Sequence, residues 1–170
     1  QKDRFAYFKS YGSGLFVVDI QSGQETFLTT IQVYVNPWDP SHFVWATDNY
    51  IYLTNSDSSG AQAQLYKIHS SDTEIPLEQL TEEPAYLEIL GTYDNDLDKL
   101  LLASGSNLWV YEFDSGQLSF IDSLETPHLT RQAWSMDKSK VAFGGSFGAW
   151  HTYTTMKVYD FLNDTIVALS

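Results

Sequence analysis

Short apolar stretches recur along the chain at intervals of 41 to 50 residues. Each copy is a polar pair followed by an apolar stretch, and the copies start at Asp3, Asp48, Asp98 and Ser139. Short runs of apolar residues bounded by turn signals are typical of β-strands. No stretch of 11 or more residues follows a helical period free of strand-forming residues. The pattern therefore predicts an all-β protein with almost no helix.

Two further registers share this period. Four stretches end in an apolar or aromatic residue, then a charged residue and then a second apolar residue, at 15–20, 63–68, 108–113 and 156–161. Three prolines recur with nearly the same spacing, at positions 40, 84 and 127. An all-strand repeat of this length is typical of β-propeller blades, which have four strands each. The sequence predicts a single β-propeller domain or propeller fragment of about four four-stranded blades, with approximate boundaries at 1–30, 31–81, 82–124 and 125–170.

The first predicted blade is incomplete. Gln1 directly precedes a strand of the second type, so an innermost strand is missing from the pattern, and residues 31–42 form a longer junction than the others. An unpaired strand edge attracts another strand. Three explanations stay open: upstream sequence completes the blade, residues 31–35 fill the gap, or two chains complete each other as a homodimer.

One blade carries a recognisable motif. The stretch from Trp134 to Phe143, which reads Trp-Ser-Met-Asp-Lys-Ser-Lys-Val-Ala-Phe, and the later Met156–Asp160 resemble the TolB-like (Trp-Asp-type) propeller repeat. Met136 and Lys138 stand where that family has Pro and Gly, and Gly91 replaces the Trp in the third copy. The resemblance implies a propeller, commonly exported or membrane-tethered in bacteria, that binds other proteins. It favours a periplasmic or extracellular location and allows for an upstream membrane tether.

Composition narrows the choice of partner. The formal charge is −13, with nine Lys and Arg against 22 Asp and Glu. Such acidity argues against nucleic acid and anionic lipid surfaces as partners, because both attract clustered basic residues. The chain has no Cys, which excludes thiolate nucleophiles and Cys-based zinc sites. It has no apolar run long enough to insert into a membrane. No cofactor is expected.

Three motifs that could carry chemistry have simpler explanations. Residues 144–148 match the Gly-x-Ser-x-Gly nucleophile pattern, but that motif needs a strand-to-helix turn and no helix is predicted after it. Residues 94–98 resemble the start of a calcium loop, yet Lys99 and Gly105 occupy the places that require Gly and Glu. The four histidines, at positions 42, 69, 128 and 151, lack the close spacing of a zinc site. We therefore expect no metal site, no catalytic residues and no enzymatic activity.

Large aromatic residues are the richest feature of the sequence. Most recur at equivalent repeat positions, as Trp45 and Trp134 do, and are explained by packing between blades. A set that does not recur is predicted to bind a partner: Trp38, Phe147, Trp150, His151 and Tyr153. The leading hypothesis is a non-enzymatic extracytoplasmic binding or sensing module with a protein partner. The alternatives are carbohydrate recognition or hydrolysis, and a structural part of a larger propeller.

Overall fold

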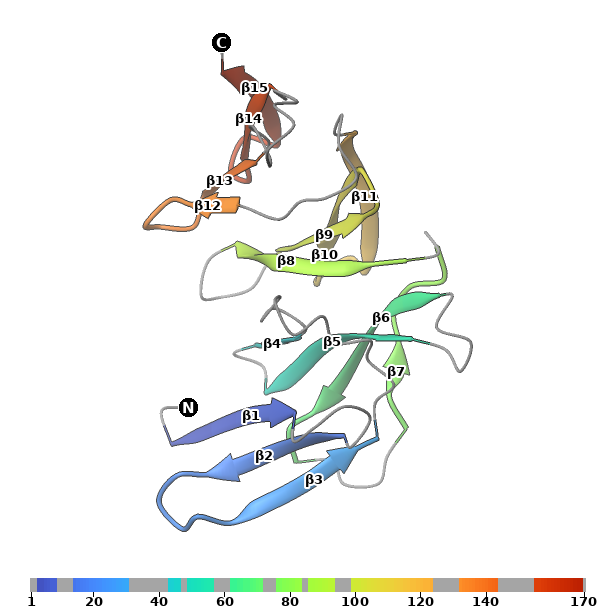
Figure 1. Ribbon diagram of the computed structural model, residues 1–170, viewed down its shortest axis with the longest axis vertical. Helices are drawn as coiled ribbons and strands as arrows, with labels where there is room; N and C mark the ends of the chain where they lie inside the picture. Colours follow the sequence, from blue (N-terminus) through green and yellow to red (C-terminus); the bar gives the residue numbers. More distant parts are fainter. Residues whose placement is uncertain are drawn as a thin grey trace, which may run out of the picture. The chain divides into compact units, whose positions relative to one another are not determined.

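The computed structural model describes ten stretches of the chain: 3–8, 14–30, 43–46, 49–56, 62–71, 76–83, 86–93, 99–123, 132–143 and 155–169. They contain fifteen β-strands and no helix, so the prediction of an all-β chain is confirmed (Figure 1). The strands form four antiparallel sheets, one with three strands and three with four. We call these sheets the first to fourth blades. The chain divides into two compact units, Gln1–Ile89 and Leu90–Ser170.

The first unit holds the first two blades, and in each the strands pair in chain order. The first blade consists of β1 (Arg4–Phe8), β2 (Leu15–Asp19) and β3 (Glu25–Thr29). The second blade consists of β4 (Phe43–Trp45), β5 (Tyr50–Ser56), β6 (Ala63–His69) and β7 (Glu78–Gln79). The repeat pattern of the sequence predicts an outer strand at 76–80, and the observed β7 is shorter. It follows Pro76, whose ring nitrogen has no hydrogen to donate to a ladder.

Apolar residues from both blades fill the core of the first unit. Leu15, Val17 and Leu28 of the first blade form one buried cluster with Ile51, Leu53 and Ile68 of the second. Trp45 and Tyr66 pack against this cluster, as expected for aromatic residues at recurring positions. In each strand alternate residues face this core, because side chains of a β-strand alternate between the two faces of its sheet.

The second unit repeats this arrangement. The third blade consists of β8 (Glu88–Tyr93), which starts just before the boundary of the unit, β9 (Lys99–Ser104), β10 (Asn107–Glu112) and β11 (Gln117–Ser123). The fourth consists of β12 (Gln132–Trp134), β13 (Lys140–Phe143), β14 (Met156–Asp160) and β15 (Thr165–Leu169). A register shift between Leu108 and Trp109 interrupts the pairing of β10 with β11.

The core of the second unit explains why Gly91 stands where the repeat has Trp. Trp134 of the fourth blade packs against the buried cluster and stacks on Phe161, with ring centroids 5.5 Å apart. A Cβ atom added to Gly91 would lie 2.6 Å from Cζ2 of Trp134. Gly91 also has a φ of +149°, which disfavours residues with a side chain. The tryptophan of one blade thus occupies the space that a side chain on the preceding blade would need.

The first blade has three strands among the described residues, as the sequence predicts. The repeat pattern of the sequence predicts innermost strands at 43–45, 87–90 and 132–134. The structure has β4 and β12 at the first and third of these ranges, and β8 overlaps the second and extends to Tyr93. The blade boundaries and the prediction of a single domain stay predictions.

Candidate functional site

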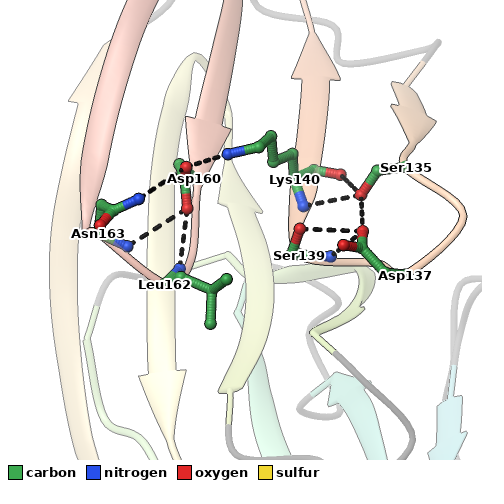
Figure 2. Close-up of polar contacts among 7 residues, drawn as sticks. All are labelled: Ser135, Asp137, Ser139, Lys140, Asp160, Leu162 and Asn163. Atoms are coloured by element: carbon green, nitrogen blue, oxygen red, sulfur yellow. Dashed lines mark hydrogen bonds and ion pairs between the residues drawn. The ribbon is translucent and has the colours of Figure 1, made fainter.

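A polar network joins two turns at one end of the fourth blade (Figure 2). In the turn between β12 and β13, the hydroxyl of Ser135 donates to Oδ1 of Asp137 at 2.6 Å. The same oxygen accepts the backbone N–H of Ser139 at 3.1 Å and its hydroxyl at 2.9 Å. Such side-chain bonds to a nearby backbone are the usual way in which Asp and Ser define a turn. They hold the turn although Lys138 has a φ of +54°, where the family repeat has Gly.

The second half of the network centres on Asp160, the last residue of β14. Its carboxylate accepts the backbone N–H groups of Leu162 at 3.0 Å and Asn163 at 3.3 Å, and the side-chain amide of Asn163 at 3.0 Å. The Lys140 ammonium forms an ion pair with the same carboxylate. Lys140 lies directly opposite Asp160 in the β13–β14 ladder, so this contact links the two turns.

The electrostatics of the network favour a structural role. The Ser135 hydroxyl and the Ser139 N–H lower the pKa of Asp137 to about 2. The Lys140 ammonium and the Asn163 amide do the same for Asp160, whose pKa is also about 2. Both carboxylates are therefore ionised at neutral pH and are engaged in hydrogen bonds. General acid–base catalysis works best when the pKa lies near the working pH, and these two groups are far from that condition.

Equivalent contacts occur in other blades. Lys99 and Glu112 lie opposite each other in the third blade and form an ion pair at 3.4 Å, and the Ser115 hydroxyl donates to Glu112 at 3.2 Å. Arg4 lies opposite Asp19 in the first blade, where Asp19 accepts the N–H and the hydroxyl of Ser22. In the described part of the chain, the first blade lacks an innermost strand, so β1 and β2 correspond to the second and third strands of the other blades. With this numbering, a basic residue at the start of the second strand faces an acidic residue at the end of the third strand in these blades.

The second blade replaces this charged pair with aromatic residues. Tyr50 faces His69, with ring centroids 5.1 Å apart, and Nδ1 of His69 is 2.7 Å from the hydroxyl of Ser71. Because the position recurs in every blade, it belongs to the framework that holds the strand ends. None of the sequence-based predictions includes this element. Its signal was available: an acidic residue or His closes the third strand, and Ser or Asn follows two or three positions later.

The predicted binding residues Trp38, Phe147, Trp150, His151 and Tyr153 lie outside the described residues. The Ser146 motif, the acidic stretch 94–98 and three of the four histidines also lie outside them. The structure does describe the strands on which the segment 144–155 begins and ends. Phe143 and Lys157 are paired at this end of the ladder, and Phe143 is buried.

The connection between the second and third strands differs most among the blades. In the third blade, Ser104 and Asn107 are paired and only two residues separate the strands. Six residues separate them in the first blade and six in the second. Twelve residues, 144–155, separate β13 from β14 in the fourth. The fourth blade therefore carries the longest connection of this kind, on a strand pair whose other end is fixed by the polar network.

The described stretches contain no group of three His, Asp or Glu side chains that could hold a metal ion. They also contain no helix with the length and apolar character that a membrane crossing requires.

Comparison with known proteins identifies the fold. No family model matches the chain, and no curated protein matches it by sequence. Among solved structures, the tricorn protease is similar to the chain at 14% identity with a TM-score of 0.69, over 98% of the chain. A putative TolB from Agrobacterium tumefaciens matches 95% of the chain at 10% identity and a TM-score of 0.62. A nidogen/laminin complex matches 98% at 13% identity and a TM-score of 0.60.

These structures are longer than the present chain. The chain spans 15% of the tricorn protease chain, 56% of the putative TolB chain and 58% of the matched chain in the nidogen/laminin complex. At such low identity the likeness establishes the fold alone, because one fold hosts many functions. The resemblance to the TolB-like repeat agrees with the presence of a TolB structure among the matches, but it does not assign the chain to that family.

The expectation that the chain is not an enzyme is wrong. The tricorn protease is an enzyme, and two other matches are a dipeptidyl peptidase 4 from Porphyromonas gingivalis, with a TM-score of 0.57, and an oligogalacturonate lyase from Vibrio parahaemolyticus, with a TM-score of 0.55. The expectation rested on the propeller repeat and on the lack of a motif for catalysis. Enzymes share this fold, so the repeat is no argument against catalysis. What the structure and the comparisons establish is that the chain has the β-propeller fold.

Proposed function

We propose that the chain is a partner-binding part of an extracytoplasmic propeller of the TolB-like type. Its contact residues are those of the non-recurring aromatic set, Trp38, Phe147, Trp150, His151 and Tyr153. The observation that carries the proposal is the twelve-residue connection 144–155, which holds four of these five residues on a ladder that is otherwise closed by short turns. Binding loops on rigid scaffolds follow this plan.

The described framework supports such a loop in two ways. At its base, Val141 and Phe143 on β13 and Tyr159 on β14 are all buried in the core of the second unit. At the far end of the same strands, the Lys140–Asp160 contact holds β13 and β14 together. A segment that begins and ends on two fixed strands loses less conformational entropy on binding than one on mobile strands.

Charge and the comparisons suggest the kind of partner. The net charge of −13 favours a basic protein surface, because complementary charge speeds encounter and suppresses wrong partners. One matched solved structure is a complex of two proteins, nidogen and laminin. Exposed Trp and Tyr rings also stack on sugars, which keeps carbohydrate recognition as the competing function.

The test is a selection of peptides from a random displayed library against the chain, followed by affinity measurements on the selected peptides. We expect enrichment of Lys and Arg, weaker binding at higher salt, and at least a ~10-fold loss of affinity in Trp150→Ala. Met136→Ala is the matched control, because Met136 is a fully exposed apolar residue in the β12–β13 turn of the same blade. Its affinity should equal that of the unmodified chain.

Two results would count against this function. Equal binding of the selected peptides by the Trp150→Ala variant would remove the aromatic loop from the contact. Hits on a glycan array that Trp150→Ala abolishes, together with a failed peptide selection, would favour carbohydrate recognition instead. Thermal unfolding of Trp150→Ala within a few degrees of the unmodified chain would show that the substitution leaves the fold intact.

A further inference from the structure

One face of the fourth blade is apolar and partly exposed. Met156 lies opposite Leu169, and Val158 lies opposite both Val167 and Ala142, so these five side chains share one face of the sheet. Met156 is 45% exposed, Val167 55% and Leu169 48%. The opposite face of the same sheet, with Val141 and Tyr159, is buried in the core. We call the set Ala142, Met156, Val158, Val167 and Leu169 the trailing face.

The same positions in the third blade are buried. The ion pairs Lys99–Glu112 and Lys140–Asp160 fix the register between the two blades, and in this register Met156 corresponds to Leu108 and Val158 to Val110. Leu108 and Val110 are 0% and 2% exposed, and they form one cluster with Val141, Phe143 and Tyr159 of the fourth blade. The trailing face is thus the kind of surface on which a following blade packs.

The first blade presents a complementary surface. Phe5, Tyr7, Phe16, Val18 and Phe27 share one face of its sheet, which we call the leading face. Its rings are in contact in sequence: Phe5 with Tyr7 at 5.7 Å, Tyr7 with Phe16 at 5.9 Å and Phe16 with Phe27 at 5.3 Å between centroids. Phe5 is 50% exposed. The other face of this blade is the one that packs on the second blade.

The equivalent positions of other blades show which kind of surface the leading face can pack against. Phe5 corresponds to Ile51 in the second blade and to Val141 in the fourth, since each follows the first residue of its blade's second strand. Ile51 and Val141 are both fully buried against the blade that precedes them in the chain. The leading face therefore has the character of a surface that packs on a preceding blade.

We propose that a second copy of this chain binds head to tail, with the trailing face of one copy against the leading face of the other. Each copy carries both halves of an inter-blade contact, so the interface needs no other protein. Contacts between two different patches of identical chains are heterologous and close into rings when the geometry allows. This proposal is independent of the aromatic loops.

An ion pair marks the contact between the third and fourth blades: the Lys157 ammonium binds the Asp122 carboxylate. In the repeat register, Lys157 corresponds to Phe16 on the leading face and Asp122 to Leu169 on the trailing face. At the proposed interface, a contact between Phe16 of one copy and Leu169 of the other replaces this ion pair. Introducing Lys at position 16 and Asp at position 169 would therefore recreate the ion pair that joins the third and fourth blades.

The first measurement is the mass of the chain by sedimentation as a function of its concentration. We expect a concentration-dependent rise from 19.3 kDa toward twice that value. Met156→Glu buries a charge in the interface and should raise the dissociation constant at least ~10-fold, whereas Met136→Glu should leave it unchanged. Met136 is the matched control because it is an exposed methionine in a turn, away from the trailing face. Circular dichroism checks that each variant is folded.

The second measurement is a charge rescue. Leu169→Asp and Phe16→Lys should each weaken association at least ~10-fold, and the chain with both changes should recover most of that loss. A chain that stays at 19.3 kDa up to ~100 μM would overturn the proposal, because a contact of standard size would be formed at that concentration. So would equal effects of Met156→Glu and Met136→Glu, or a double variant that associates no better than the single ones. In those cases another protein's blade, or a further blade of a longer chain, is the better occupant.

Discussion

The third and fourth blades share one framework and differ in what is added to it. Both have four antiparallel strands, a basic residue opposite an acidic one and a polar turn after the third strand. The third blade joins its middle strands with two residues, whereas the fourth uses twelve. Leu108 is fully buried in the third blade, but the equivalent Met156 is 45% exposed in the fourth. Repeated features therefore describe the fold, and departures from the repeat locate the candidate functions.

The largest expected difference in stability effects between these blades concerns Leu108 and Met156, which occupy equivalent positions. Leu108→Ala should lower the free energy of unfolding by about 3 kcal/mol, because it opens a cavity in the core. Met156→Ala should lower it by less than about 1 kcal/mol, because the side chain is partly exposed already. Denaturant unfolding at low chain concentration measures both. Similar losses in the two variants would mean that the faces are equally buried and would remove the contrast.

A smaller effect is expected at Gly91, where the two blades meet. Gly91→Ala places a Cβ atom 2.6 Å from Trp134 and puts a side chain on a residue with positive φ. We therefore expect the free energy of unfolding to fall by about 2 kcal/mol. Gly105→Ala is the control: its φ is also positive, at +57°, but no atom lies within 4 Å of the added carbon. It should lose about 1 kcal/mol from backbone strain alone. Thermal unfolding separates the two, and equal losses would show that Trp134 makes room without cost.

The smallest effect concerns acid stability, to which the polar network of the fourth blade contributes. The pKa of Asp137 and that of Asp160 are each lowered from the ordinary value of 3.8 to about 2. A carboxyl group with a lowered folded-state pKa stabilises the fold above its unfolded-state pKa, and this contribution disappears as the pH falls toward the folded-state value. Between pH 5 and pH 2, the melting temperature should therefore fall less steeply in Asp137→Asn and Asp160→Asn than in the unmodified chain. Parallel curves would show that neither carboxylate matters for stability.

Local sequence information was sufficient to place most of the strands. The alternation of apolar residues and the turn signals are properties of neighbouring positions, and they located strands such as β4 and β12 at their observed bounds. The shortening of β7 after Pro76 was also available from residue chemistry, since proline cannot donate a ladder hydrogen bond.

Spatial relations were beyond the sequence. That Trp134 fills the space over Gly91 depends on how two blades pack, which no local pattern encodes. The link between the two halves of the polar network was missed because Lys140 and Asp160 are 20 positions apart in the sequence, and only the ladder register brings them together. The exclusion of enzymatic activity failed for a different reason: it inferred function from fold, although one fold supports many activities.

The tight hairpin between Ser104 and Asn107 has a consequence for engineering and for evolution. Its flanking ladder has the same direction and pairing as the ladder that frames residues 144–155. A long connection could therefore be grafted onto the third blade in place of Gly105 and Ser106 while the strands beneath it keep their partners. Each blade then offers an equivalent strand pair on which a recognition segment can be gained or lost independently, while the strands themselves are inherited unchanged.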